Sequence, residues 1–294
     1  MKKRSLVVLS HLVLVALLLA GCQQQGQALP SDPVAAVKLI VDKQKEVKTQ
    51  HSALELDLVL KVDGLPSNDP TAALLQNFKA NAKIEGDFDN AASDFSLQGE
   101  ADLGILTAFL AGGADTIQFE AVKLGDKVYT RLADQEWSES SADLSSATGD
   151  ETQAPACASD MLAGQLNELL KKVATAEKLD DVAIDGVDSY HFRVSLDAVE
   201  LINAISALAA ECGGEAIPAA DLEQAGELLK DTELTLEMWV GKSDLFVRQQ
   251  KFHLGLNLRD IPDAPAEMVV NADLDVTTKA SKINEPVTIT DPTQ

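Results

Sequence analysis

The stretch LELDLVLKV, residues 54–62, decides the fold class of this chain. Its even-numbered residues, Leu54 to Val62, are all apolar, whereas Glu55, Asp57 and Lys61 at odd positions are charged. Successive side chains of a β-strand point to opposite faces, so this period of two predicts a strand with one apolar face and one wet face.

The same alternation recurs along the chain and predicts roughly ten strands. The further apolar sets lie at 82–88, 95–101, 117–121, 128–132, 182–184, 190–196, 234–240, 252–258 and 268–276. Turn sequences such as Asp89-Asn90 and the four residues 124–127 separate several of these sets. Strands with one apolar and one wet face are typical of a large antiparallel sheet.

Helical signals interrupt the strands. Asp32 can cap a helix over residues 33–47, and Pro33 suits its first turn. Asp197 can cap another helix, with Glu200 placed for a capping box. Further helices are predicted over 103–111, 159–176 and 218–230, and a mobile loop over 138–155.

A long sheet must cover its apolar face. The pattern therefore predicts an α+β fold, in which one large curved antiparallel sheet, a half-barrel, carries helices on its concave apolar face. The hydrophobic fraction of 46% is sufficient for a core, and the aromatic fraction of 4% makes that core mainly aliphatic.

The N-terminus has the order of a bacterial export signal. A cationic head, residues 1–4, precedes an apolar run, residues 5–20, which is short for a membrane span of about 20 residues. Leu19-Ala20-Gly21-Cys22 follows and resembles the lipobox, in which the cysteine thiol receives a diacylglycerol and the peptide is cut before the cysteine. The alternative is an uncleaved anchor with an incidental cysteine.

This reading divides the chain into a lipoprotein signal peptide (1–21), a polar tether (22–31) and a single domain (32–294). Cys22 would carry the lipid, with palmitate among the expected chains, and two or more acyl chains anchor a protein stably. We therefore expect export to the outer face of the cell membrane, or to the outer membrane where the host has one. The net charge of −23 disfavours nucleic acid as a partner.

Two cysteines remain after Cys22. Because export implies an oxidising compartment, Cys157 and Cys212 are predicted to form a disulfide, and the alternative is a pair of free, buried thiols. Their spacing matches neither a redox motif nor a zinc motif.

Several segments together resemble the LppX/LprA/LprF/LprG lipoproteins, whose fold is similar to that of the LolA/LolB carriers. The lipobox at Cys22 comes first, and the Gly125, Tyr129 and Trp137 segment lies near the middle. The other matching pieces are 47–51, 82–89, 94–103, 182–194, 236–254 and 283–292. The resemblance implies a half-barrel that encloses acyl chains and carries or presents lipids in the cell envelope.

Sequence motifs of enzymes are missing. The sequence contains no Gly-x-Ser-x-Gly elbow, His-Glu-x-x-His pair or P-loop. His51, His191 and His253 fall in the polar phase of their strands, which predicts exposed surface positions. We expect no enzyme activity, no metal site and no cofactor.

Two functions remain. The first is a monomeric, membrane-anchored lipoprotein that binds a lipid or glycolipid in an apolar cavity. The candidate lining residues are Leu56, Leu58, Leu60, Phe88, Phe95, Leu97, Phe119, Phe192, Leu236, Met238, Phe252 and Leu254. The second is an envelope scaffold or sensor with a solid core, whose acidic outer face binds a partner protein.

Overall fold

The computed structural model describes residues 29–65, 75–104, 107, 115–133, 135–141, 174–211, 218–259, 261, 264–265 and 267–293. Twelve strands form one open antiparallel sheet. They are β1 (Thr49–Asp63), β2 (Phe78–Asp89), β3 (Asp94–Asp102), β4 (Ile117–Leu124), β5 (Lys127–Leu132), β6 (Ser138–Ser141), β7 (Ala174–Lys178), β8 (Val182–Ile184), β9 (Val187–Leu196), β10 (Glu233–Gly241), β11 (Val247–Leu258) and β12 (Val269–Ser281).

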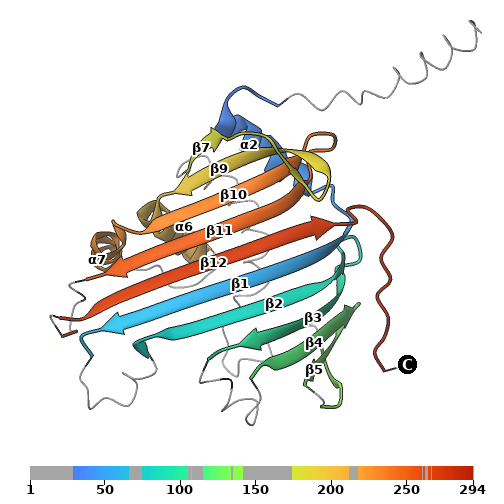
Figure 1. Ribbon diagram of the computed structural model, residues 1–294, viewed down its shortest axis with the longest axis horizontal. Helices are drawn as coiled ribbons and strands as arrows, with labels where there is room; N and C mark the ends of the chain where they lie inside the picture. Colours follow the sequence, from blue (N-terminus) through green and yellow to red (C-terminus); the bar gives the residue numbers. More distant parts are fainter. Residues whose placement is uncertain are drawn as a thin grey trace, which may run out of the picture.

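The first and last strands meet in the middle of the sheet. The order is β6-β5-β4-β3-β2-β1-β12-β11-β10-β9-β7, and β8 pairs with β9 beside this path. β1 pairs with β12 over thirteen residue positions, from His51 with Ser281 to Asp63 with Val269. The two halves of the chain therefore build opposite sides of one sheet (Figure 1).

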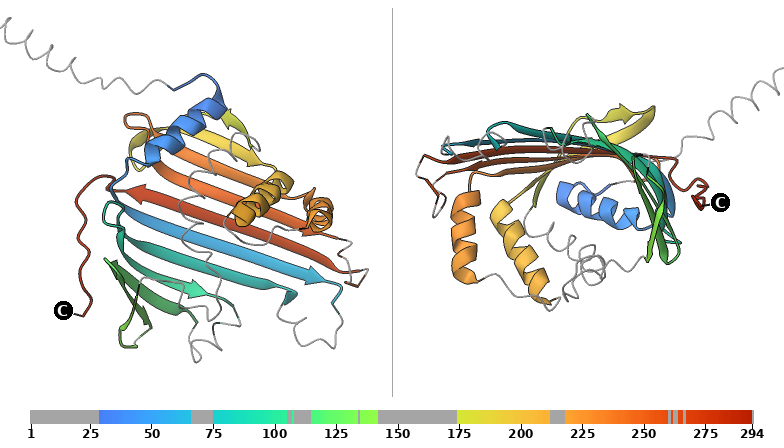
Figure 2. Two further views of the ribbon diagram at one scale, coloured as in Figure 1. Left: turned by 180° about the vertical axis from the view of Figure 1, so that it is seen from behind. Right: turned by 90° about the horizontal axis from the view of Figure 1, so that it is seen from below.

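Three helices lie on one side of this sheet: α2 (Pro33–Gln44), α6 (Ala198–Glu211) and α7 (Ala219–Leu229). Figure 2 shows the sheet bending around this side, with α2 lying along it and α6 and α7 pointing away from it. The fold class predicted from the period of two is confirmed. No helix within the described ranges is long and apolar enough to cross a bilayer.

Local signals explain where the helices begin. The Asp32 carboxylate accepts a hydrogen bond from the Ala35 backbone N–H at 2.9 Å, and Pro33 opens α2. Asp197 caps α6 through the N–H groups of Val199 and Glu200. A cap satisfies backbone donors that the first helical turn leaves free.

Two sequence predictions are wrong at their ends. Residues 174–176, predicted as the end of a helix, belong to β7, because their backbone pairs with β9 from Leu196 to Val194. Residues 138–141, predicted as loop, form β6 against β5. In both places the segment forms a strand because it pairs with the backbone of a neighbouring strand, and its own composition does not predict that pairing.

Other predictions fall outside the described residues. They are the signal peptide and most of the tether, the lipidation site Cys22, the helix over 159–173, most of the helix over 103–111, and the disulfide between Cys157 and Cys212. These stay predictions.

Candidate functional site

One face of the sheet is apolar across most of its strands. Cross-strand pairing brings its inward-pointing residues into rows through β11, β12, β1 and β2. Four rows hold Leu258, Val270 and Val62; Leu256, Ala272, Leu60 and Phe78; Leu254, Leu274, Leu58 and Ala80; and Phe252, Val276, Leu56 and Ala82. At about 3.4 Å per residue, the rows cover about 20 Å along β1.

The α2 end of this face is filled. Ala36, Val37 and Ile40 of α2 pack into a cluster that we call the α2 core. Its sheet and turn members are Phe192, Val194, Met238, Val240, Leu245 and Val247. Phe192 and Met238 are each only 1% exposed, so nothing further can reach these side chains.

Hydrogen bonds from one glutamine fix α2 on the sheet. Gln44 Nε2 donates to the carbonyl oxygens of Ile40 and Leu245, at 2.9 and 3.0 Å. Gln44 Oε1 accepts from the Val247 N–H at 3.0 Å. The last turn of α2 is thereby joined to the turn between β10 and β11.

Away from α2, the same face is only half-buried. We call this region the open face: the half-buried inward residues of β1 to β4, β11 and β12. Its principal members are Leu54, Leu56, Leu58, Leu60, Ile84, Leu97, Phe119, Phe252, Leu254, Leu256, Leu274 and Val276. None of these side chains is fully buried, so the face keeps some accessible apolar surface that a ligand could cover.

The other two described helices, α6 and α7, point away from the sheet rather than lying along it (Figure 2). α7 contacts β11 and α6, and none of its side chains is buried. α7 therefore provides partial cover rather than a core.

Small residues on β2 to β4 deepen the open face. Ala82 of β2 lies opposite Ala101 of β3, and Gly86 lies opposite Leu97. Gly99 is needed because the Phe119 ring lies across it: a Cβ there would come within 2.5 Å of the ring. Phe119 can therefore lie flat on the sheet, and the small residues at these positions add no large side chain of their own.

The face turns polar at the end nearest the C-terminus of α2. A pocket of about 300 Å³ lies there, between α2 and strands β1, β11 and β12. The inward-facing residues around it include Gln50, Ser52, Gln250 and Thr278. Each occupies a position that the alternation would fill with an apolar residue.

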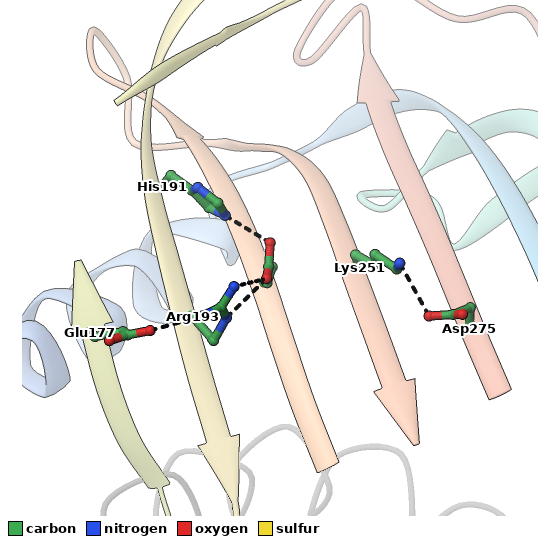
Figure 3. A network of polar contacts seen from close by, with 6 residues as sticks. Glu177, His191, Arg193, Lys251 and Asp275 are labelled. Atoms are coloured by element: carbon green, nitrogen blue, oxygen red, sulfur yellow. Dashed lines mark hydrogen bonds and ion pairs between the residues drawn. The ribbon is translucent and has the colours of Figure 1, made fainter. Parts of the chain in front are cut away.

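The opposite, outer face carries cross-strand ion pairs, shown in Figure 3. Arg193 of β9 bonds both Glu237 of β10, at 2.8 Å, and Glu177 of β7, at 3.2 Å. His191 Nε2 lies 2.9 Å from the other oxygen of Glu237. Lys251 of β11 pairs with Asp275 of β12 at 3.3 Å.

These contacts shift the pKa of Glu237. Burial of the carboxyl raises its pKa, but hydrogen bonds from Arg193 and His191 outweigh burial, so the pKa is lowered below its ordinary value. Bonding to Glu237 in turn raises the pKa of Arg193. The network holds its charges in a fixed arrangement typical of a structural ion-pair cluster.

A wider hollow of about 500 Å³ lies on the outer side of β1 to β4. Glu55, Lys83, Glu85, Glu100 and Glu120 line it. Hydrogen bonds already occupy part of this set, because Gln98 donates to Glu85 and Arg131 bonds Glu120. This hollow is the part of the outer face that best matches the predicted acidic partner surface.

The twelve predicted lining residues share the inward face, but they divide into three groups. Phe192 and Met238 belong to the α2 core, and Leu236 packs against it. Phe88 and Phe95 face each other at one edge, with ring centroids 6.3 Å apart. Leu56, Leu58, Leu60, Leu97, Phe119, Phe252 and Leu254 lie on the open face.

The three histidines lie on the outer face as predicted, but they are not simply exposed. His191 has a side chain only 13% exposed and stacks on Trp239, with ring centroids 4.4 Å apart. His51 lies 2.8 Å from Asp87, and His253 lies 3.2 Å from Asp275. Within the described ranges, no three His, Cys, Asp or Glu side chains gather as a metal site would require.

Sequence reasoning missed the polar end of the face. The available signal was Gln50 and Ser52 in the inward phase of the strand that continues through Leu54. Only the register shows that Gln250 and Thr278, which pair with each other near the other end of the chain, lie next to these two residues, at the level of Leu54.

Comparisons with known proteins give matches among solved structures. No protein-family model matches the sequence, and no curated protein matches it. Lipoprotein LppX of Mycobacterium tuberculosis is 14% identical, with 87% of this chain and 97% of that chain covered and a TM-score of 0.41. LprF of Mycobacterium bovis is 15% identical, with 89% and 99% covered and a TM-score of 0.42.

A third match is a putative outer membrane lipoprotein-sorting protein domain from Vibrio parahaemolyticus. It is 9% identical, with 85% of this chain and 93% of that chain covered and a TM-score of 0.25. LppX and LprF are two of the lipoproteins that the sequence resembles.

Proposed function

We propose that this chain is a lipid-anchored, non-enzymatic carrier that holds the acyl chains of a lipid or glycolipid against the open face. The observation that carries the proposal is the contrast within one sheet face. The inward residues beside α2 form a closed core, whereas Leu56, Leu58 and Leu60 remain half-buried.

Acyl chains suit this surface chemically. The open face consists almost wholly of aliphatic side chains with Phe119 and Phe252, and none of its principal members is charged. Transfer of each CH₂ group from water to such a surface contributes about 0.8 kcal/mol. Long chains can therefore bind without specific polar contacts, and α7 can adjust its cover because none of its side chains is buried.

The anchor completes the proposal. Cys22 would carry covalent lipid, and residues 22–31 would tether the domain to the envelope surface. A carrier fixed in this way exchanges its cargo with the membrane or with other envelope components.

The test is native mass spectrometry on the chain from Gln23 onward, followed by lipid extraction. We expect a mass excess that dissociates as a discrete lipid. The matched variants are Leu58→Glu, on the open face, and Val59→Glu, the next residue, which points outward and is 40% exposed.

Loading should be lost in Leu58→Glu and kept in Val59→Glu, with both variants folded by circular dichroism. Equal loading in the two variants would remove the open face from the proposal. A bare protein mass after incubation with envelope lipids would favour the alternative, a scaffold whose acidic hollow binds a partner protein.

A further inference from the structure

We propose that the polar pocket at the α2 end of the open face binds an uncharged, hydroxyl-bearing headgroup, such as a sugar or glycerol, of the lipid whose chains lie on that face. This inference rests on the proposed function and names the ligand class. It follows from where the pocket lies, from the groups that line it and from their charge.

The pocket lies at the level where three strands change from apolar to polar. Along β1, Ser52 precedes Leu54 on the same face, and along β11, Gln250 precedes Phe252. Along β12, Thr278 follows Val276. Thr278 pairs with both Leu54 and Gln250, so β11 and β12 turn polar at the same level, and β1 turns polar one inward residue further along, at Ser52.

A ligand with apolar chains on the rows above would thus meet the polar pocket at one end only. The wall on that side is the end of α2, at Gln44 and Val47. The volume of about 300 Å³ equals the liquid volume of about ten waters, which suits a small polar headgroup rather than a second acyl chain.

The side chains of this pocket can both donate and accept hydrogen bonds. Gln50 and Gln250 each offer an amide, and Ser52 and Thr278 each offer a hydroxyl. No described residue forms a hydrogen bond with these four side chains, and none of their polar atoms is fully buried. A hydroxyl group needs both a donor and an acceptor, and this mixed set supplies them.

The charges around the pocket do not favour an anion. Arg248 lines it, but its guanidinium is ion-paired with Asp244 within the same turn. In the sheet register, Lys279 lies opposite Gln249 and Ala53, at positions whose side chains point to the outer face. Its side chain therefore points away from the pocket. Of the two basic side chains at the pocket, a phosphate headgroup would therefore find the Arg248 guanidinium already paired through one nitrogen, with its unpartnered Nε buried, and the Lys279 ammonium on the other side of the sheet.

The test compares lipids with identical acyl chains in competition for a fluorescent acyl probe, using the full chain in one detergent. The competitors are dipalmitoyl glucosylglycerol and dipalmitoyl phosphatidate. We expect the glucosyl lipid to compete about tenfold better, as a few neutral hydrogen bonds would give.

The variants are Thr278→Val and Gln250→Leu, alone and together, with Thr277→Val on the outer face as control. The double variant should lose the roughly tenfold preference while still binding both lipids, and the control should keep it. The pocket variants and the control variant should all have a midpoint of urea unfolding close to that of the wild type. The side-chain groups that they remove form no hydrogen bond with a described residue.

The outcomes separate this inference from the proposed function. Equal competition by both lipids in the wild type, or a preference for phosphatidate, overturns the headgroup assignment and leaves acyl binding intact. Unchanged preference in the double variant also overturns it. If the fluorescent acyl probe does not bind to the wild-type protein at all, so that neither lipid can displace it, the result contradicts the carrier function itself.

Discussion

At the α2 end of the sheet, Phe192 and Met238 are each 1% exposed, whereas Leu58 and Phe119 on the same face are only half-buried. All four come from strands with the same alternation of apolar and polar residues. The difference lies in helix packing: α2 lies along the sheet and closes the first pair, whereas α6 and α7 point away from the sheet (Figure 2). One sheet face thus supplies both a core and a surface for binding.

The largest expected difference between the two regions is the loss of stability when a buried ring is removed from each. Phe192→Ala removes a ring from a closed core and should reduce the free energy of unfolding by about 3–5 kcal/mol. Phe119→Ala, in a half-buried site, should cost less than about half of that, because much of its surface is already accessible. Urea unfolding of delipidated protein measures both, and equal losses would contradict the division into core and open face.

Lipid binding should stabilise the protein through the open face and not through the α2 core. At a lipid concentration of about 100 times Kd, binding should raise the free energy of unfolding by about 2.7 kcal/mol. The gain should persist in Val59→Glu and vanish in Leu58→Glu. Thermal unfolding with and without dipalmitoyl glucosylglycerol checks this, and a gain retained in Leu58→Glu would place the ligand elsewhere.

The outer face behind the α2 core should be sensitive to pH. The pKa of Glu237 is lowered in the folded state, so its contacts stabilise the fold above the unfolded-state pKa of about 4.5 and lose that effect as the pH falls through the folded-state value. Glu237→Gln should cost about 1–2 kcal/mol at pH 7, and the gap to wild type should narrow below about pH 4.5.

Glu177 provides the control within the same network. Its side chain is 58% exposed, so Glu177→Gln should cost less than about 0.5 kcal/mol at any pH. Urea unfolding between pH 7 and pH 3 gives both curves. A gap for Glu237→Gln that widens as the pH falls would have the wrong sign for this network.

A small effect is expected at the helix that closes the core. Asp32→Ala removes the cap that accepts from Ala35 N–H, and should cost about 1 kcal/mol. Asp32→Asn should recover most of this, because an amide oxygen can also cap. Urea unfolding measures the loss of stability in both variants. If hydrogen exchange showed that Asp32→Ala lowers protection only on the open face, the cap would not stabilise the α2 core.

Much of the fold was accessible from the sequence. The period of two assigned Leu56, Leu58 and Phe252 to the inward face, because side-chain direction in a strand depends only on parity. The caps at Asp32 and Asp197 marked the starts of α2 and α6. Strands β6 and β7 were missed because their short segments are held by pairing with β5 and β9 rather than by their own composition.

Only part of the candidate site could be predicted from the sequence. Sequence placed Phe192 and Met238 in the same class as Leu58 and Phe252, and nothing in their strands distinguishes them. The polar pocket was missed although Gln50 lies in the inward phase, because only the pairing of β1 with β12 brings Gln250 and Thr278, near the other end of the chain, beside it. The three paired histidines could be assigned to a face but not to their carboxylate partners.

By itself, then, the sequence determined which residues face inward, where helices start and that the inward face is aliphatic. Those properties follow from local geometry and side-chain chemistry. The tertiary structure alone decided which part of that face becomes a core, since this depends on where Gln44 fixes α2 across the turn at Leu245. It also decided where the polar end lies, because β1 pairs with β12 from the other end of the chain, from His51 with Ser281 to Asp63 with Val269.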